Sequence, residues 1–194
     1  MRTPKLLMVL GFAVFTIPLM AQPRVAITTP LGEIVVELDA ESAPITTGNF
    51  LLNLVDRGEL DGATFYRVVT KTNQPDNDVK IEVIQGGLGG NPKAPELEPI
   101  AHETTKVSRL KHLDGTISMA RREPGTASSE FFICVGDQPE LDFGGKRNPD
   151  GQGFAAFGRV ISGMDVVRAI HKLPADGQML KEQVRITSVK RVDE

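Results

Sequence analysis

Short segments in which apolar residues alternate with polar ones recur along the chain, a pattern typical of half-buried β-strands. Glycine and proline, 19 and 13 of the 194 residues, separate these segments and indicate many turns. Residues 86–113 are instead predicted to form an irregular surface segment broken by prolines. The predicted strands cover residues 24–29, 32–39, 64–69, 80–85, 115–121, 129–136, 153–161 and 183–192.

Two segments show apolar residues at helical spacing. Residues 42–60 begin with Ser42 as a cap and Pro44 in the first turn, and Gly58 ends the predicted helix. Residues 164–173 form the second predicted helix. Eight strands and two helices predict a mainly β protein with a closed eight-stranded antiparallel β-barrel, because closure removes exposed strand edges.

The first twenty-one residues have the organisation of a secretory signal peptide. Arg2 and Lys5 form a positive start, residues 6–20 are almost continuously apolar, and Ala21 is a small residue at the cleavage point. An uncleaved membrane anchor is the alternative, since the residue three positions before the cut is bulkier than usual. We therefore expect an exported protein, periplasmic or secreted, whose single domain covers residues 22–194.

Composition narrows the classes of partner. A net charge of −3 and the absence of a long basic run argue against binding to nucleic acid.

The single cysteine, Cys134, lies in an apolar segment, which predicts a buried small hydrophobic residue and no internal disulfide. Neither a heptad pattern nor a large apolar helix face is present, so we expect a monomer.

The motifs for metal, nucleotide and nucleophilic chemistry are incomplete. His102 begins a segment like the zinc-protease helix, but Lys106 replaces the second histidine. His112 and His171 lack partners at metal-ligand spacing and are predicted to be surface or structural residues. The chain also lacks a complete dinucleotide, phosphate-loop, nucleophile-elbow or calcium-loop motif. We therefore predict no metal and no cofactor.

One predicted strand carries a charge among apolar residues. In the segment TFYRVV, residues 64–69, alternation places Arg67 on the same face as Phe65 and Val69. A surface salt bridge would account for such an arginine, and a donor facing a binding pocket would account for it equally well.

Four ordered segments resemble the cyclophilin family of peptidyl-prolyl cis-trans isomerases. They are APITTGNFLLN, FYRVV followed by VIQGG, GTISMAR, and SSEFFICVG with FAAFGRVISGMDVV behind it. The resemblance extends from about residue 24 to residue 192. It implies the family's eight-stranded antiparallel barrel capped by two helices, which agrees with the number of predicted strands, and proline-containing polypeptides as partners.

Prolyl isomerisation fits a chain without nucleophile or metal. Rotation about an Xaa-Pro bond breaks no σ bond, and the obstacle is amide resonance, a barrier of about 18–20 kcal/mol. In the twisted amide the prolyl nitrogen becomes pyramidal and gains a lone pair that accepts a hydrogen bond. A permanently charged donor beside an apolar pocket favours this state over both planar forms.

The resemblance implies the role of each site residue. Arg67 matches the family's catalytic arginine, and Gln85 matches the glutamine that holds the substrate backbone. Taken alone, Phe132 and Leu141 would fit simple core packing. The apolar residues assigned to the proline pocket and the groove beside it are Phe132 as the floor, Ala120, Leu141, Val83 and Phe154.

Several positions depart from the family pattern. They are Glu82 and Val83 in place of phenylalanine and methionine, Glu130 in place of glutamine, Glu140 in place of tryptophan, and Phe154 in place of histidine. We therefore predict reduced turnover, altered substrate choice and poor binding of cyclosporin-type inhibitors. A weakly catalytic proline-peptide-binding or chaperone module is the alternative to an isomerase, and a hydrolase lacks a nucleophile–base pair.

Overall fold

The computed structural model describes residues 22–89, 95 and 97–192. The predicted signal peptide lies outside these residues. None of the helices in the described part is both long enough and apolar enough to span a membrane.

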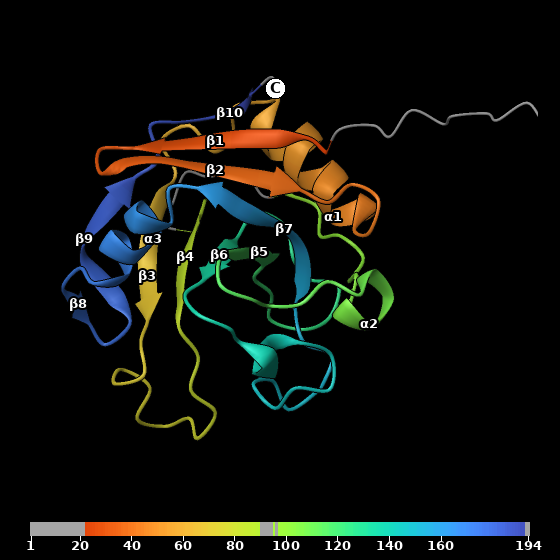
Figure 1. Cartoon of the computed structure of the whole chain (residues 1–194), viewed down its shortest axis with the longest axis vertical. Helices are drawn as coiled ribbons and strands as arrows, with labels where there is room; N and C mark the ends of the chain where they lie inside the picture. The colour runs from red at the N-terminus through yellow and green to blue at the C-terminus, as the bar shows by residue number, and fades with distance from the viewer. Residues whose placement is uncertain (1–21, 90–94, 96, 193–194) are drawn as a thin grey trace, which may run out of the picture.

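The described chain folds into one antiparallel sheet with short helical segments around it (Figure 1). The strands are β1 Arg24–Thr29, β2 Gly32–Leu38, β3 Thr64–Val69, β4 Val83–Gly87, β5 Thr116–Met119, β6 Phe131–Cys134, β7 Ala155–Ser162, β8 Ala175–Asp176, β9 Met179–Arg185 and β10 Ser188–Val192. The helical segments are α1 Pro44–Asn49, the π-helical η1 Phe50–Val55, α2 Thr105–Ser108, the 3-10 turn η2 Pro139–Leu141 and α3 Met164–His171. The mainly β class is confirmed.

The sheet has ten strands in the order β10-β1-β2-β7-β5-β6-β4-β3-β9-β8, so the predicted count of eight is wrong. The short strand β8 was not predicted, and the predicted last strand divides because the chain changes partners at Ile186 and Thr187. The Ile186 amide donates to the Ala63 carbonyl at 2.7 Å, and the Thr187 amide donates to the Thr28 carbonyl at 2.8 Å. Thus β9 pairs with β3 while β10 pairs with β1. The predicted closed barrel is therefore not closed by a continuous ladder of hydrogen bonds.

The first predicted helix is present, but Ser42 does not cap it. The Ser42 amide instead donates to Asp39, and α1 begins after Ala43. The Glu103 carboxylate, distant in sequence, accepts hydrogen bonds from the amides of Ile45 and Thr46 at 3.1 and 2.7 Å. A carboxylate at this end also suits the partial positive charge of a helix N-terminus.

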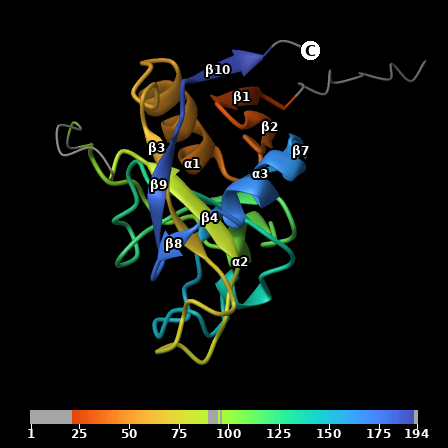
Figure 2. The ribbon, with the colours of Figure 1, turned by 90° about the vertical axis from the view of Figure 1, so that its left-hand side faces the viewer.

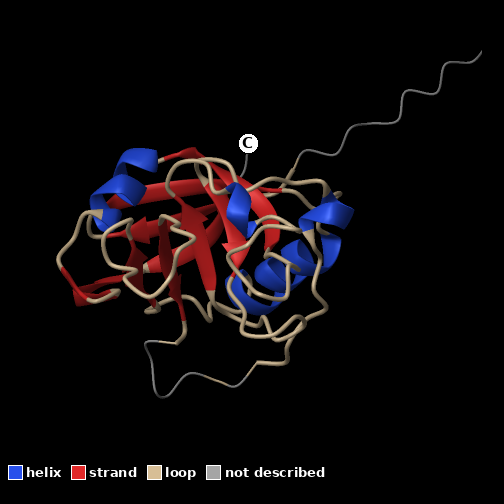
Figure 3. Ribbon diagram, turned by 90° about the horizontal axis from the view of Figure 1, so that it is seen from below, coloured by secondary structure: helices blue, strands red, loops and turns tan. Residues whose placement is uncertain are grey.

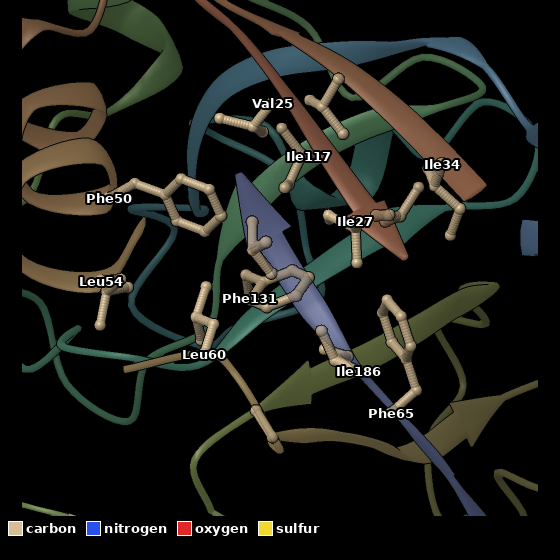
Figure 4. Close-up of a cluster of buried hydrophobic side chains, with 14 of the residues drawn as sticks. Val25, Ile27, Ile34, Phe50, Leu54, Leu60, Phe65, Ile117, Phe131 and Ile186 are labelled. Atoms are coloured by element: carbon tan, nitrogen blue, oxygen red, sulfur yellow. The ribbon is translucent and has the colours of Figure 1, made fainter. Parts of the chain in front are cut away.

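Aromatic side chains from helix and sheet form the centre of the core. Phe50 of η1 and Phe65 of β3 each meet the ring of Phe131 edge-on, with centroids 5.7 Å apart (Figure 4). The helices lie at the margins of the sheet, which occupies the middle of the molecule (Figure 3). The packed core therefore supports β3, β4 and β6 from one side and leaves their other side for a pocket.

Candidate active site

A β-bulge in β3 determines where Arg67 points. The pairing of β3 with both β4 and β9 shifts register between Phe65 and Arg67, and opposite β4 Tyr66 is the extra residue. Phe65 and Val68 therefore pack in the main core, whereas Val69 joins the second apolar cluster beside Arg67. The predicted common face of Arg67 and Val69 is confirmed, and the inclusion of Phe65 was wrong because alternation fails across a bulge.

All seven site residues predicted from the sequence line one pocket of about 220 Å³. Phe132 and Leu141 are almost fully buried and form its floor with Val83, and the ring of Phe154 meets that of Phe132 edge-on at 5.3 Å. The pocket is also lined by Ile81, Arg121, Arg147 and Asn148, which the sequence did not indicate. The two last residues lie in an insertion, where no motif marks them. The predicted members of the pocket are Arg67, Val83, Gln85, Ala120, Phe132, Leu141 and Phe154.

Uncharged acceptors hold the Arg67 guanidinium. Its Nη1 donates to Gln85 Oε1 at 2.6 Å, and its Nε and Nη2 both donate to Gln178 Oε1 at 3.0 and 2.5 Å. Within the described residues these bonds use three of the five guanidinium N–H groups, which leaves two to address a ligand. Burial lowers the pKa of Arg67, yet an arginine stays protonated at neutral pH.

Gln178 was missed because it follows Gly177 in an ordinary-looking hairpin turn. Its own Nε2 donates to the Asn73 carbonyl at 3.2 Å, and its carbonyl accepts a hydrogen bond from the Val68 amide at 2.9 Å. Gln178 is thus fixed at both ends and orients Arg67 from the side opposite Gln85.

Gln85 is oriented in turn by Tyr66. The Gln85 Nε2 donates to Tyr66 Oη at 2.7 Å, and Tyr66 Oη donates to Glu130 Oε2. Glu130 also accepts a hydrogen bond from the Gly89 amide at 2.7 Å. Burial, followed by the hydrogen bond and charge of Glu130, raises the pKa of Tyr66, so Tyr66 remains a neutral hydroxyl. Glu130, which stands in place of the family's glutamine, therefore acts through Tyr66 to orient the Gln85 amide so that its oxygen meets Arg67.

Besides Glu130, two departures from the family pattern, Glu82 and Glu140, do not line the pocket. The Glu82 carboxylate pairs with Lys71 at 3.4 Å. The Glu140 carboxylate accepts a hydrogen bond from the Lys146 amide at 2.8 Å and so supports the loop that follows η2. Neither side chain lines the pocket, and among the departures only Val83 and Phe154 do.

A row of hydrogen-bonded polar residues lies behind the pocket floor. His112 joins Asp142 through Nδ1 at 2.8 Å and Ser118 through Nε2 at 3.0 Å. All three are buried, and the His112 ring stacks on Phe132 with centroids 5.9 Å apart. The row has the order of a hydrolytic triad but no access to a substrate, which confirms His112 as a structural residue. Among the described residues no group of three potential ligands is arranged to hold a metal ion.

The fold and this pocket define the class of protein. Residues 24–191 match the family described as cyclophilin type peptidyl-prolyl cis-trans isomerase/CLD. Because the match covers most of the chain, the chain belongs to the cyclophilin-type peptidyl-prolyl cis-trans isomerase family. The family and the enzyme class predicted from the sequence are thus confirmed.

Relatives from several bacteria are similar over most of their length. Isomerase cyp18 of Streptomyces antibioticus is 39% identical over 75% of this chain and 81% of its own. Isomerase A of Dickeya dadantii is 33% identical over 79% of this chain and 73% of its own. A crystal structure of a cyclophilin type isomerase of Cryptosporidium parvum is 23% identical, covers 89% of this chain and 99% of its own, and has a TM-score of 0.72. That structure confirms the cyclophilin-like fold.

Replacing Tyr66 by phenylalanine removes the hydroxyl between Gln85 and Glu130 and frees the Gln85 amide to rotate. We expect kcat on an Xaa-Pro peptide to fall about three- to tenfold, the effect of one lost hydrogen bond, while KM changes little. A matched control is Thr64→Val on the same strand, which removes the exposed hydrogen bond to Gln183. An unchanged kcat in Tyr66→Phe would show that Tyr66 has only a structural role.

Proposed function

We propose that this chain accelerates rotation about Xaa-Pro bonds in exported polypeptides, and that Arg67 donates the hydrogen bond that stabilises the twisted amide. The observation that carries the proposal is that, among the described residues, Gln85 and Gln178 alone fix the guanidinium, at the edge of a pocket with an apolar floor. No carboxylate among the described residues pairs with this guanidinium, so its positive charge is not neutralised. A relative from C. parvum was crystallised in the presence of the dipeptide Ala-Pro, a ligand of the expected chemistry.

The proposed mechanism gives each of these residues one role. The prolyl ring rests on Phe132 and Leu141, and Gln85 holds the peptide backbone. As the amide twists, the prolyl nitrogen gains its lone pair on the side where Arg67 has an unused N–H. The interaction forms fully only in the twisted state, so it lowers the barrier and does not simply tighten binding.

The alternative of a weakly catalytic binding module has less support. It depended on Glu82, Glu140 and Phe154, and the first two side chains lie outside the pocket. Phe154 remains as the aromatic wall in place of histidine. Arg67 and Phe132, the proposed donor and the proposed floor, line the same pocket, which supports the isomerase.

Arg67→Ala should lower kcat/KM on a short Xaa-Pro peptide about a hundredfold, the usual effect of removing one donor from a preorganised site. Arg67→Lys keeps the charge but not the planar fork, and we expect it to restore only a small part of the rate. Arg67→Ala should change the free energy of unfolding much less than it changes the activation free energy of the reaction, because an arginine without a charged partner adds little stability. If both variants keep the wild-type rate, Arg67 does not act in catalysis.

We further propose that residues 1–21 direct export. The support is the positive start at Arg2 and Lys5 and the apolar stretch that follows. Expressed with its full sequence in a Gram-negative host, the protein should appear outside the cytoplasm with a mature mass that begins at Gln22. Full-length mass in the cytoplasmic fraction would contradict export, and full-length mass in the membrane fraction would show an uncleaved anchor.

A further inference from the structure

The pocket holds more positive charge than prolyl isomerisation requires. Three arginines, Arg67, Arg121 and Arg147, line it, and no acidic residue does. Arg121 is neutralised because Asp150 accepts two hydrogen bonds from its guanidinium at 2.8 and 3.0 Å. The other two have no carboxylate within 4.0 Å among the described residues. The chain as a whole carries a net charge of −3, so the pocket is a local exception.

Arg147 is brought to the pocket by two neighbouring loops. The loop of residues 70–82 between β3 and β4 and the loop of residues 143–153 after η2 lie side by side (Figures 1 and 2). The Arg147 Nη1 donates to Gln74 Oε1 and to the Val79 carbonyl, both at 2.7 Å. These bonds use one nitrogen of the guanidinium, and its Nε and Nη2 make no hydrogen bond within the described residues.

Hydrogen bonds to Glu140 also fix the backbone at Arg147. Its amide donates to the Glu140 carbonyl at 3.2 Å, and the neighbouring Lys146 amide donates to the Glu140 carboxylate. A Cβ at Gly145 would stand 2.4 Å from the Glu140 carbonyl oxygen, so only glycine fits there. Arg147 is therefore positioned before any ligand arrives, which reduces the ordering entropy lost on binding.

Two like charges in a partly buried pocket favour an anion. Burial, followed by the positive charge of Arg67, lowers the pKa of Arg147. Both guanidiniums are only partly exposed, so water screens their repulsion less than on an open surface. A carboxylate bound by the unused Nε and Nη2 of Arg147 would form charge-assisted hydrogen bonds there and relieve the repulsion, and it would leave the unused N–H groups of Arg67 for the prolyl amide.

We propose that Arg147 makes the enzyme selective for prolines that directly follow or precede an aspartate or glutamate. The inference rests on the proposed isomerase function. Arg147 lines the same small pocket as Phe132, the floor for the prolyl ring, so the peptide residue next to that ring is the one within reach. Arg147 acts as a specificity-determining residue, and its contribution adds to that of Arg67.

The test uses peptides with blocked ends, so that a terminal carboxylate cannot take the place of the side chain. Glutamate, glutamine or lysine is placed immediately before or immediately after the proline, and each catalysed rate is compared with the uncatalysed rate of the same peptide. We expect kcat/KM to be about five- to tenfold higher for glutamate than for glutamine at one of these positions, and lowest for lysine. Raising sodium chloride from about 0.01 M to about 1 M, which shortens the Debye length from about 30 Å to about 3 Å, should lower the glutamate-to-glutamine ratio without abolishing it, because the guanidiniums are partly buried.

Variants assign the preference to one residue. Arg147→Gln should reduce the glutamate-to-glutamine ratio to about one, whereas Arg147→Lys should keep part of it. The control is Arg159→Gln, an exposed arginine on β7 outside the pocket, which should leave the ratio unchanged. If Arg147→Gln fails to fold, the partial loss of the ratio in Arg147→Lys tests the residue, and the salt series on the unaltered protein tests the contribution of charge.

The outcomes separate this inference from the function on which it rests. Wild-type acceleration of all the peptides with equal rates for glutamate and glutamine at both positions would overturn the selectivity alone. A preference that survives in Arg147→Gln would overturn the role of Arg147. No acceleration of any peptide would overturn the isomerase function and the selectivity together.

Discussion

The site depends on hydrogen bonds that orient the Arg67 guanidinium without neutralising its charge. A carboxylate beside Arg67 would hold it firmly but would also occupy its donors and cancel its charge. Gln85 and Gln178 supply neutral oxygens instead, and each is itself fixed by Tyr66 or Asn73. The bulge at Tyr66 is what allows two successive side chains of β3 to meet the same glutamine. The geometry of the donor thus follows from one irregularity in the sheet.

The pocket floor depends on a second buried arrangement. Phe132 lies between Phe154 on the pocket side and the His112 ring behind it. Both nitrogens of His112 are bonded, to Asp142 and Ser118, so its ring is fixed although it is polar and buried. The hydrogen bonds of this row lower the pKa of Asp142 against the opposing effect of burial. A residue set with the chemistry of a hydrolase here serves to keep an aromatic floor in place.

The sequence predicted much of the fold and of the pocket, and the failures have common physical causes. Alternation located β3 to the residue, but it could not show the bulge, which depends on pairing with β4 and β9. It joined β9 and β10 into one strand because the change of partners at Ile186 leaves the apolar pattern intact. Motif matching found residues in or next to strands and Leu141 of η2. It missed Gln178, which bonds Arg67 from a turn, and Arg147, which lines the pocket from an insertion. Such residues are defined by tertiary contacts and leave no local signal.

The claim that Arg67 acts on the twisted amide is tested most directly by measuring cis–trans exchange of a saturating Xaa-Pro peptide on the enzyme by NMR, alongside its dissociation constant. In Arg67→Ala the account predicts that exchange on the enzyme slows about a hundredfold while the dissociation constant stays within about threefold of wild type. An unchanged exchange rate with greatly weakened binding would contradict it, because Arg67 would then hold the ground state and not the transition state.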